Sequence, residues 1–162
     1  MTAADLGLGE WACLGLVYPA PTHGFAVAAR LKPDADFGRV WSLSRPLTYR
    51  ALDQLTARGY VCAIGEEPGI AGGSRTILAA TRTGRAQLRR WLQTPVLHLR
   101  DVRTELVLKL LLAEFCSVDV RQMLQRQHLQ IRQFADAIAA RCADEDPADL
   151  VALWRMESSQ AA

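Results

Sequence analysis

Apolar residues recur every three to four positions in two stretches near the start of the chain, and each stretch predicts a helix. The first covers residues 6–18 and is ended by Pro19 and Pro21. The second covers residues 23–31, and the hydroxyl of Thr22 is expected to cap it. Both helices would turn their apolar faces toward a shared core.

A third helix is predicted over residues 45–58 by signals at both of its ends. Ser44 suits the N-cap, because its hydroxyl can accept a hydrogen bond from a first-turn N–H. Pro46 lies in the first turn, where its missing donor costs nothing. Gly59 follows at the position where many helices end in a left-handed conformation.

A β-hairpin is expected after this helix. Residues 60–64 and 75–80 are predicted to form its two strands. The segment between them, residues 66–74, contains one proline and three glycines, which is typical of a flexible tip. Thr81 is then expected to cap a further helix, which Pro95 ends.

The last third of the chain is predicted to be helical. Residues 100–115 are apolar nearly all round, so this helix should be buried on most sides. Ser117 or Asp119 is expected to cap a long helix that follows, and a short last helix is expected over residues 149–157. The long helix contains a heptad seam, formed by Leu124, His128, Ile131, Ala135, Ile138 and Cys142.

These elements predict a mainly α-helical chain with a small β-hairpin, divided into two lobes. Residues 1–95 would form an N-terminal winged helix-turn-helix, because three helices followed by a hairpin is the element order of that module. Residues 96–162 would form a C-terminal helical dimerisation lobe, because they carry more apolar surface than a lobe of this size can cover. The alternative is that these helices pack back on the first lobe of the same chain.

Composition and motifs narrow the classes of protein. Half of the 162 residues are hydrophobic, which is enough for a sizeable core. No apolar run approaches the roughly 18–20 residues of a membrane helix, and the acidic start does not resemble a signal peptide, so we expect a cytoplasmic protein without a membrane partner. The four cysteines and three histidines show no metal-ligand spacing. Because catalytic and nucleotide-binding motifs are also missing, we expect no enzyme activity, no metal and no cofactor.

The overall net charge of +2 conceals an uneven distribution. Residues 37–90 contain nine arginines and three acidic residues, a net charge of +6. From residue 98 onward there are eight basic and ten acidic residues, a net charge of −2. A basic first lobe favours double-stranded DNA as its partner, because phosphate attraction is the main sequence-independent part of DNA binding.

The candidate DNA contacts lie where a winged helix meets a duplex. The N-terminal half of the third helix usually faces the bases, the hairpin reaches the minor groove or the backbone, and a helix start can bind a phosphate. The side chains at these places are Ser44, Arg45, Tyr49, Arg50, Arg75 and His23. The alternatives are that the arginines are solvated surface charges, that Tyr49 packs against its neighbours and that His23 caps a helix.

Three segments in this order resemble the PadR family of transcriptional regulators. PTHGFAVAARL (residues 21–31) is similar to that family's entry into its second helix. SRPLTYRALDQLTARGYV (residues 44–61) is similar to its recognition helix and first strand, and TRTGRAQLRRWL (residues 81–92) to the helix after its wing. The resemblance covers about residues 8–92.

The resemblance implies a dimeric repressor with a small aromatic or drug-like effector between its lobes. It also implies that Ser44, Tyr49 and Arg50 contact DNA and that Arg75 lies in the wing. Residues 46–48 depart from the family, since they are Pro-Leu-Thr where Gly-Thr-Leu is common.

We therefore predict a sequence-specific transcriptional regulator, a repressor that binds a palindromic operator as a homodimer. The predicted dimer interface comprises Leu106, Leu110, Leu124, His128, Ile131, Ala135 and Ile138. The alternative function is a winged-helix module that binds a protein partner and no DNA.

Overall fold

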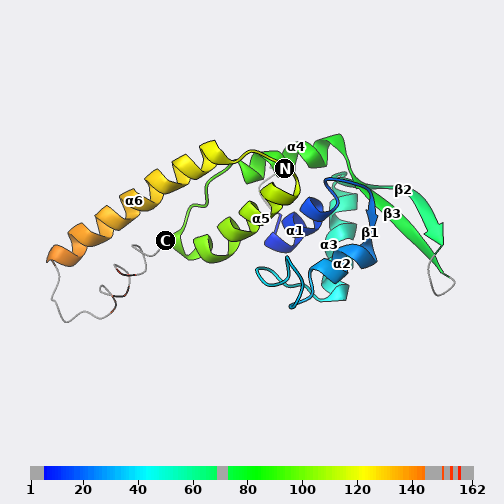
Figure 1. The fold of residues 1–162 in the computed structure, drawn as a ribbon, viewed down its shortest axis with the longest axis horizontal. Helices are drawn as coiled ribbons and strands as arrows, with labels where there is room; N and C mark the ends of the chain where they lie inside the picture. Colours follow the sequence, from blue (N-terminus) through cyan, green and yellow to red (C-terminus); the bar gives the residue numbers. More distant parts are fainter. Residues whose placement is uncertain (1–5, 69–72, 145–150, 152–153, 155–156, 158–162) are drawn as a thin grey trace.

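The computed structural model describes residues 6–68 and 73–144 together with residues 151, 154 and 157 (Figure 1). The predicted mainly α-helical fold with a small β-hairpin is confirmed. The wing-tip residues Gly69 and Gly72 and most of the helix expected over residues 149–157 lie outside the described residues. The elements are α1 (Leu8–Leu16), β1 (Thr22–His23), α2 (Gly24–Arg30), α3 (Arg45–Ala57), β2 (Val61–Pro68), β3 (Ser74–Ala80), α4 (Arg82–Leu92), a 3-10 turn (Leu99–Asp101), a π turn (Val102–Leu106), α5 (Val107–Phe115) and α6 (Arg121–Asp144).

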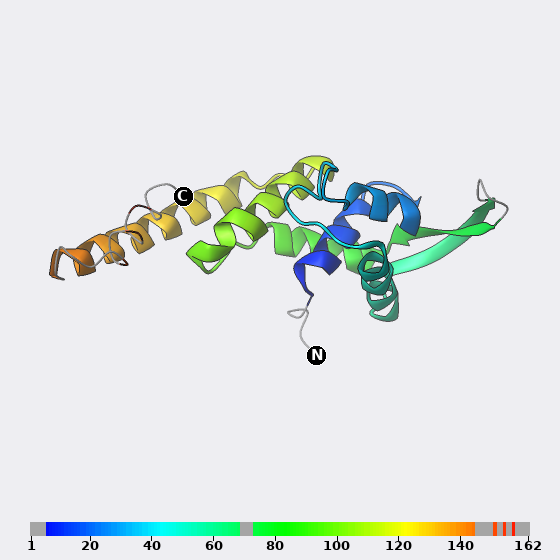
Figure 2. The same cartoon turned by 90° about the horizontal axis from the view of Figure 1, so that it is seen from below.

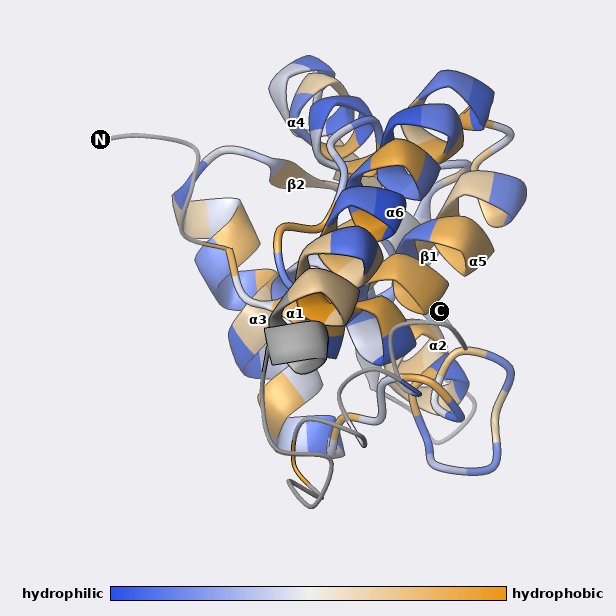
Figure 3. Cartoon of the chain, turned by 90° about the vertical axis from the view of Figure 1, so that its left-hand side faces the viewer, coloured by the Kyte–Doolittle hydropathy of each residue, from blue (hydrophilic) through white to orange (hydrophobic). Residues whose placement is uncertain are grey.

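The molecule is elongated, with the β2–β3 hairpin at one end and α6 at the other (Figures 1 and 2). Between these ends, α1 packs against α3, α4 and α5. The hydropathy colouring in Figure 3 shows α5 as mostly hydrophobic and α4 as mostly hydrophilic, in keeping with the burial of α5. The hairpin and α6 therefore project from a common helical centre.

One hydrophobic core joins the helices of the winged helix to α5. Its fully buried leucines come from both predicted lobes and include Leu14, Leu31, Leu55, Leu88, Leu108 and Leu112. A Cβ atom on Gly15 would lie 2.4 Å from a methyl carbon of Leu112, so α1 and α5 approach more closely than a side chain at that position would permit. Because α5 shares this core with the first lobe, the core does not separate the two predicted lobes. The division between residues 95 and 96 therefore stays a prediction.

The sheet has three antiparallel strands in the order β1-β3-β2, one more than the predicted hairpin. The additional strand, β1, pairs Thr22 with Leu78 and His23 with Ile77, and so it ties the start of α2 to the wing. The strands β2 and β3 pair out to Pro68 and Ser74, which makes the tip shorter than the sequence predicted.

The junction between α3, β2 and α4 follows the signals in the sequence. Gly59 has a φ of 69°, which confirms the left-handed end predicted for α3. Thr81 caps α4, since its hydroxyl oxygen accepts the N–H of Gly84 at 3.0 Å and also donates to the Gly59 carbonyl at 2.7 Å. A Cβ atom on Gly84 would lie 2.1 Å from the Tyr60 carbonyl oxygen, so the start of α4 presses directly on the backbone after α3.

The segment 100–115 is less regular than predicted, because a 3-10 turn and a π turn precede α5. Ser117 has a φ of 54° and follows the C-terminus of α5, so its predicted role as a cap of α6 is wrong. The alternative cap, Asp119, lies two residues before the start of α6. Its carboxylate accepts a hydrogen bond from the N–H of Arg121, the first residue of the helix, at 3.0 Å. The Arg121 guanidinium lowers the pKa of Asp119 to about 2.

Lys109 is a buried cation within α5, with only 1% of its surface exposed. Its Nζ lies 2.8 Å from a carboxylate oxygen of Glu105 and donates to the Thr94 carbonyl at 2.7 Å. It also lies 4.8 Å from the centre of the Trp91 ring, which stacks on Trp11. Burial lowers the pKa of Lys109, and Glu105 opposes that shift.

Candidate nucleic-acid interface

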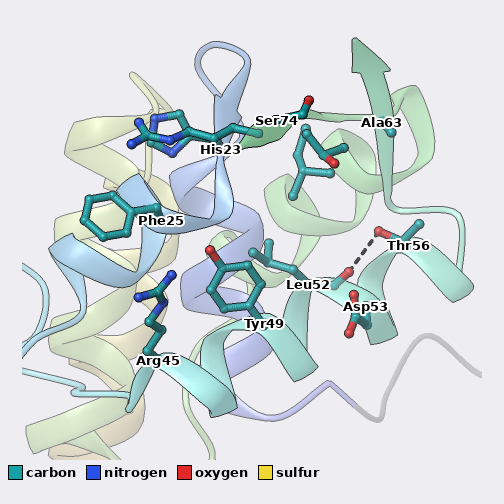
Figure 4. Close-up of a pocket in the computed structure, with 12 residues that line it drawn as sticks. His23, Phe25, Arg45, Tyr49, Leu52, Asp53, Thr56, Ala63 and Ser74 are labelled. Atoms are coloured by element: carbon teal, nitrogen blue, oxygen red, sulfur yellow. Dashed lines mark hydrogen bonds between the residues drawn. The ribbon is translucent and has the colours of Figure 1, made fainter. Parts of the chain in front are cut away.

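A cleft of about 580 Å³ lies between α3 and the β2–β3 hairpin, with the start of α2 as its third wall (Figure 4). Four of the six predicted DNA contacts line it, namely His23, Arg45, Tyr49 and Arg75. The side chain of Phe25, which is not one of the predicted contacts, lies among them. The fold thus brings together residues from three separate segments of the chain.

His23 fixes the start of α2 at the edge of this cleft. Its Nδ1 accepts the N–H of Ala26 at 3.0 Å, which confirms the capping role considered as an alternative. The predicted cap Thr22 is wrong, because Thr22 lies one residue too early and pairs in β1 instead. A Cβ atom on Gly24 would lie 2.8 Å from a Tyr49 ring carbon, so the missing side chain lets that ring lie against α2.

Two arginines from different elements, α3 and β3, lie near the Phe25 ring. The guanidinium carbon of Arg45 on α3 lies 5.4 Å from the ring centre, and that of Arg75 on β3 lies 5.5 Å from it. Both distances fall within the range of about 6 Å over which a guanidinium is attracted to an aromatic face. None of the ion pairs among the described residues includes Arg45 or Arg75, so the two positive charges are not neutralised by a carboxylate partner.

Arg75 lies in the strand predicted for it. It begins the predicted strand 75–80, follows the glycine-rich tip, and is half-buried opposite Glu67 in the β2–β3 register. Its guanidinium is near Phe25, so it faces the cleft. The reason is β1, which pairs with β3 and brings the start of α2 close to the wing.

The remaining predicted contacts lie on α3 outside the cleft lining. Ser44 is the N-cap residue, but its side chain makes no capping hydrogen bond, and both it and Arg50 are exposed. Thr48 is fully buried and its hydroxyl donates to the Ser44 carbonyl at 3.1 Å, whereas Leu47 is 49% exposed. The Pro-Leu-Thr segment is thus accommodated with its threonine inward and its leucine outward.

The β2 strand of the wing carries two acidic residues. Glu66 and Glu67 are both exposed on β2, and the Ser74 hydroxyl donates to Glu66 at 2.7 Å. Asp53 lines the far end of the cleft, near Thr56 (Figure 4). A polyanion would therefore be attracted to the part of the cleft near Phe25 and repelled from β2.

Other chemistry is limited in the described part of the chain. Burial raises the pKa of both Cys13 and Cys116 to about 12, so these thiols stay protonated. Residues 6–68 and 73–144 contain no group of three or more histidine, cysteine or acidic side chains placed to hold a metal ion. Within the same ranges, none of the helices combines the length and apolar character that a membrane span requires.

Comparison with known proteins bears on the fold. No family model matches the sequence, and no curated protein matches it. Among solved structures, the chain is similar to Bacillus subtilis PadR in a crystal structure with operator DNA, with a TM-score of 0.51 and 18% sequence identity. The match covers 94% of this chain and 92% of that chain. The chain therefore has a PadR-like winged-helix fold.

Proposed function

We propose that this protein is a DNA-binding transcriptional regulator that holds the backbone of a duplex in the cleft between α3 and β3. The observation that carries the proposal is the convergence of Arg45 and Arg75, without acidic partners, beside the N-terminal half of α3. An arginine fork binds phosphate oxygens in bidentate fashion. The similarity in fold to a PadR protein that is bound to operator DNA supports DNA as the partner.

The exposed and cleft-lining residues suggest two different roles. Arg45, Tyr49, Arg75 and His23 line the cleft, where they would contact phosphates and fix the orientation of the duplex. Arg50 lies exposed on α3 outside that lining, where it would reach a base edge in the major groove. Ser44 is exposed at the start of α3, where its hydroxyl would donate a hydrogen bond to a phosphate of the DNA backbone.

A protein partner is the second candidate. Leu47 on α3 is 49% exposed and Phe25 on α2 is 45% exposed, which is apolar surface that a partner could bury. This candidate predicts an affinity for a protein partner that does not fall with salt and that is lowered by a substitution at Leu47. The unpaired arginines favour DNA.

Duplex binding tests the proposal directly. The protein should bind a labelled duplex taken from DNA upstream of its own gene, and the logarithm of the affinity should fall linearly with the logarithm of the salt concentration. The slope should be about −0.9 for each phosphate contacted. Fluorescence anisotropy at several salt concentrations measures both quantities. Absence of binding even at low salt would contradict the proposal.

We further propose that a second copy of the chain covers the heptad seam of α6. Within its own chain α6 buries Met123 and Gln127, and Gln127 exchanges two hydrogen bonds with the Val96 backbone, at 2.7 and 3.3 Å. The seam lies on another face, where Leu124 and His128 are exposed and the later positions are half-buried: Ile131, Ala135 and Ile138. The side chain of Cys142 lies outside the described residues.

Leu106 and Leu110 have a different position from the rest of the predicted interface. Leu106 is buried against Val96 and Met123, and Leu110 packs on the same small cluster. Both leucines thus support α6 from within their own chain. We therefore propose that contacts between copies are made mainly by α6, with Leu110 at their edge.

The proposed dimer is tested by charge on the seam. Ile131→Glu with Ile138→Glu should convert a dimer into a monomer, because the variant would bury two carboxylates without partners. Sedimentation measures the change in mass, and duplex affinity should fall with it. Gln133→Glu with Ala140→Glu is the matched control, since these positions are exposed and lie off the seam. A wild-type protein that sediments as a monomer at all concentrations would contradict the dimer.

From the resemblance to the PadR family, we propose that this regulator is a repressor and that a small aromatic or drug-like effector releases it from DNA. A second hollow, of about 500 Å³, lies where α1, α4 and the α5–α6 connection meet. It is lined by Tyr18, Arg85 and Arg89, and Arg89 donates to the Tyr18 hydroxyl at 2.6 Å. Its position between the winged helix and α6 suits a ligand that changes their relative orientation.

A further inference from the structure

The Phe25 side chain is not explained by packing within the chain. It belongs to α2, whose buried residues are Gly24, Val27 and Ala28, and it is itself 45% exposed. Its ring adds little to the core, because almost half of it remains in contact with water. In Figure 4 the ring lies between His23 and Arg45 at the mouth of the cleft.

The neighbours of the ring are two like charges. The guanidinium groups of Arg45 and Arg75 both lie within 5.5 Å of the ring centre, although they come from different elements. Both groups are cations, and the described residues provide neither with an ion pair. The negative faces of the Phe25 ring attract both groups without neutralising their charges, and Arg45 also lies 5.7 Å from the centre of the Tyr49 ring.

An aromatic ring holds an arginine without using its donors. No hydrogen bond among the described residues takes an N–H group of the Arg45 or Arg75 side chain, in contrast to Arg30, which is bound to Asp36. The five N–H donors of each guanidinium therefore stay free for an incoming acceptor. A carboxylate in place of Phe25 would also orient the two arginines, but it would occupy those donors and repel a phosphate.

We propose that Phe25 is a positioning residue that presets Arg45 and Arg75 for one phosphodiester strand. This inference rests on the proposed DNA-binding function. Long arginine side chains lose conformational freedom on binding, and a ring that restricts them in the free protein removes part of that cost. The segment His23-Gly24-Phe25 then has three linked tasks, which are to cap α2, to admit Tyr49 and to orient the two arginines.

The test compares Phe25→Leu with Phe25→Trp. Leucine keeps an apolar side chain but has no aromatic face, whereas tryptophan has the face that attracts cations best. Phe25→Leu should weaken duplex binding about fivefold at low salt. Phe25→Trp should retain or strengthen binding. Thermal unfolding of Phe25→Leu should match that of the wild type, because the ring is largely outside the core.

Two further measurements separate positioning from direct contact. In an Arg45→Gln, Arg75→Gln background, Phe25→Leu should have no further effect on binding, and an undiminished fivefold loss would mean that the ring itself contacts DNA and would overturn the inference. In the free protein, the Nε–H resonances of both arginines should carry ring-current shifts. In Phe25→Leu the shift should disappear at Arg75 and decrease at Arg45, which also lies 5.7 Å from the Tyr49 ring. If the wild type binds DNA and these shifts are absent, the positioning role fails while the proposed function stands. If the wild type binds no duplex, both fail.

Discussion

Replacing Arg45 and Arg75 together by glutamine is expected to weaken duplex binding about 60-fold at 0.1 M salt. Each phosphate contact contributes about −0.9 to the slope of log affinity against log salt, so at 0.1 M one contact is worth about a factor of eight. Two lost contacts multiply, and the slope should become shallower by about 1.8. Glutamine keeps a polar side chain of moderate length, so the cleft is expected to stay intact. Anisotropy titrations over a range of salt concentrations provide both numbers.

The control for this variant removes the same charge elsewhere. Arg39 and Arg58 are exposed and do not line the cleft, so Arg39→Gln with Arg58→Gln lowers the net charge equally without touching the proposed contacts. This control should lose only a small part of the affinity. Equal losses in the two double variants would show that overall charge attracts the DNA and that the cleft has no special part. Full affinity after loss of Arg45, Arg50 and Arg75 together would refute the placement of the duplex.

Lys109→Ala is expected to lower the free energy of unfolding by about 3 kcal/mol. The substitution opens a cavity beside Trp91 and leaves the Thr94 carbonyl without its donor, while Glu105 loses the cation it faces. Lys109→Met with Glu105→Gln should cost much less, because the methionine fills the space and no charge is left unpaired. Urea denaturation followed by circular dichroism measures the difference. A loss in the double variant as large as in Lys109→Ala would assign the stability to the ion pair itself.

The pH dependence of the free energy of unfolding provides a second test, which concerns the lowered pKa of Lys109. Because burial lowers the pKa of Lys109 in the folded chain, the unfolded chain binds its proton more tightly. Stability should therefore rise with pH as the folded pKa is passed, up to the ordinary lysine value of 10.5. Lys109→Met should lack this contribution, so its stability relative to the wild type should fall across the alkaline range. A constant difference would show that the pKa is not lowered.

Local signals in the sequence were sufficient for most of the helices and for the hairpin. Thr81 and Gly59 act within a few residues of their own positions, and their predicted roles are confirmed. The two-residue strand β1 could not be predicted, because it shows no alternation and exists only through its pairing with β3. The error at Thr22 has the same origin, since strand pairing moved the cap to His23.

The candidate site was predicted by residue type more accurately than by arrangement. Arginines in a basic lobe indicated a phosphate-binding surface, and four predicted residues do line one cleft. The ring of Phe25 was missed, because its neighbours Arg45 and Arg75 are distant in sequence and meet it only in the folded chain. The one available signal was the aromatic residue directly after the Thr-His-Gly segment. The burial of Lys109 was likewise hidden, since a charge in an apolar stretch does not reveal which side of a helix it occupies.

For the proposed dimer, the close packing at Gly15 would restrict the choice of operator. Through that contact α5 is pressed against α1, and α1 in turn packs against α3. On the other side, α6 is fastened to the segment before α5 by the bonds between Gln127 and Val96. In a dimer built through α6, packed helices would connect the two copies of α3, and no flexible linker would lie between them. Such a dimer would bind two half-sites at one fixed spacing. It would bind the same half-sites much more weakly when they are moved apart by a few base pairs.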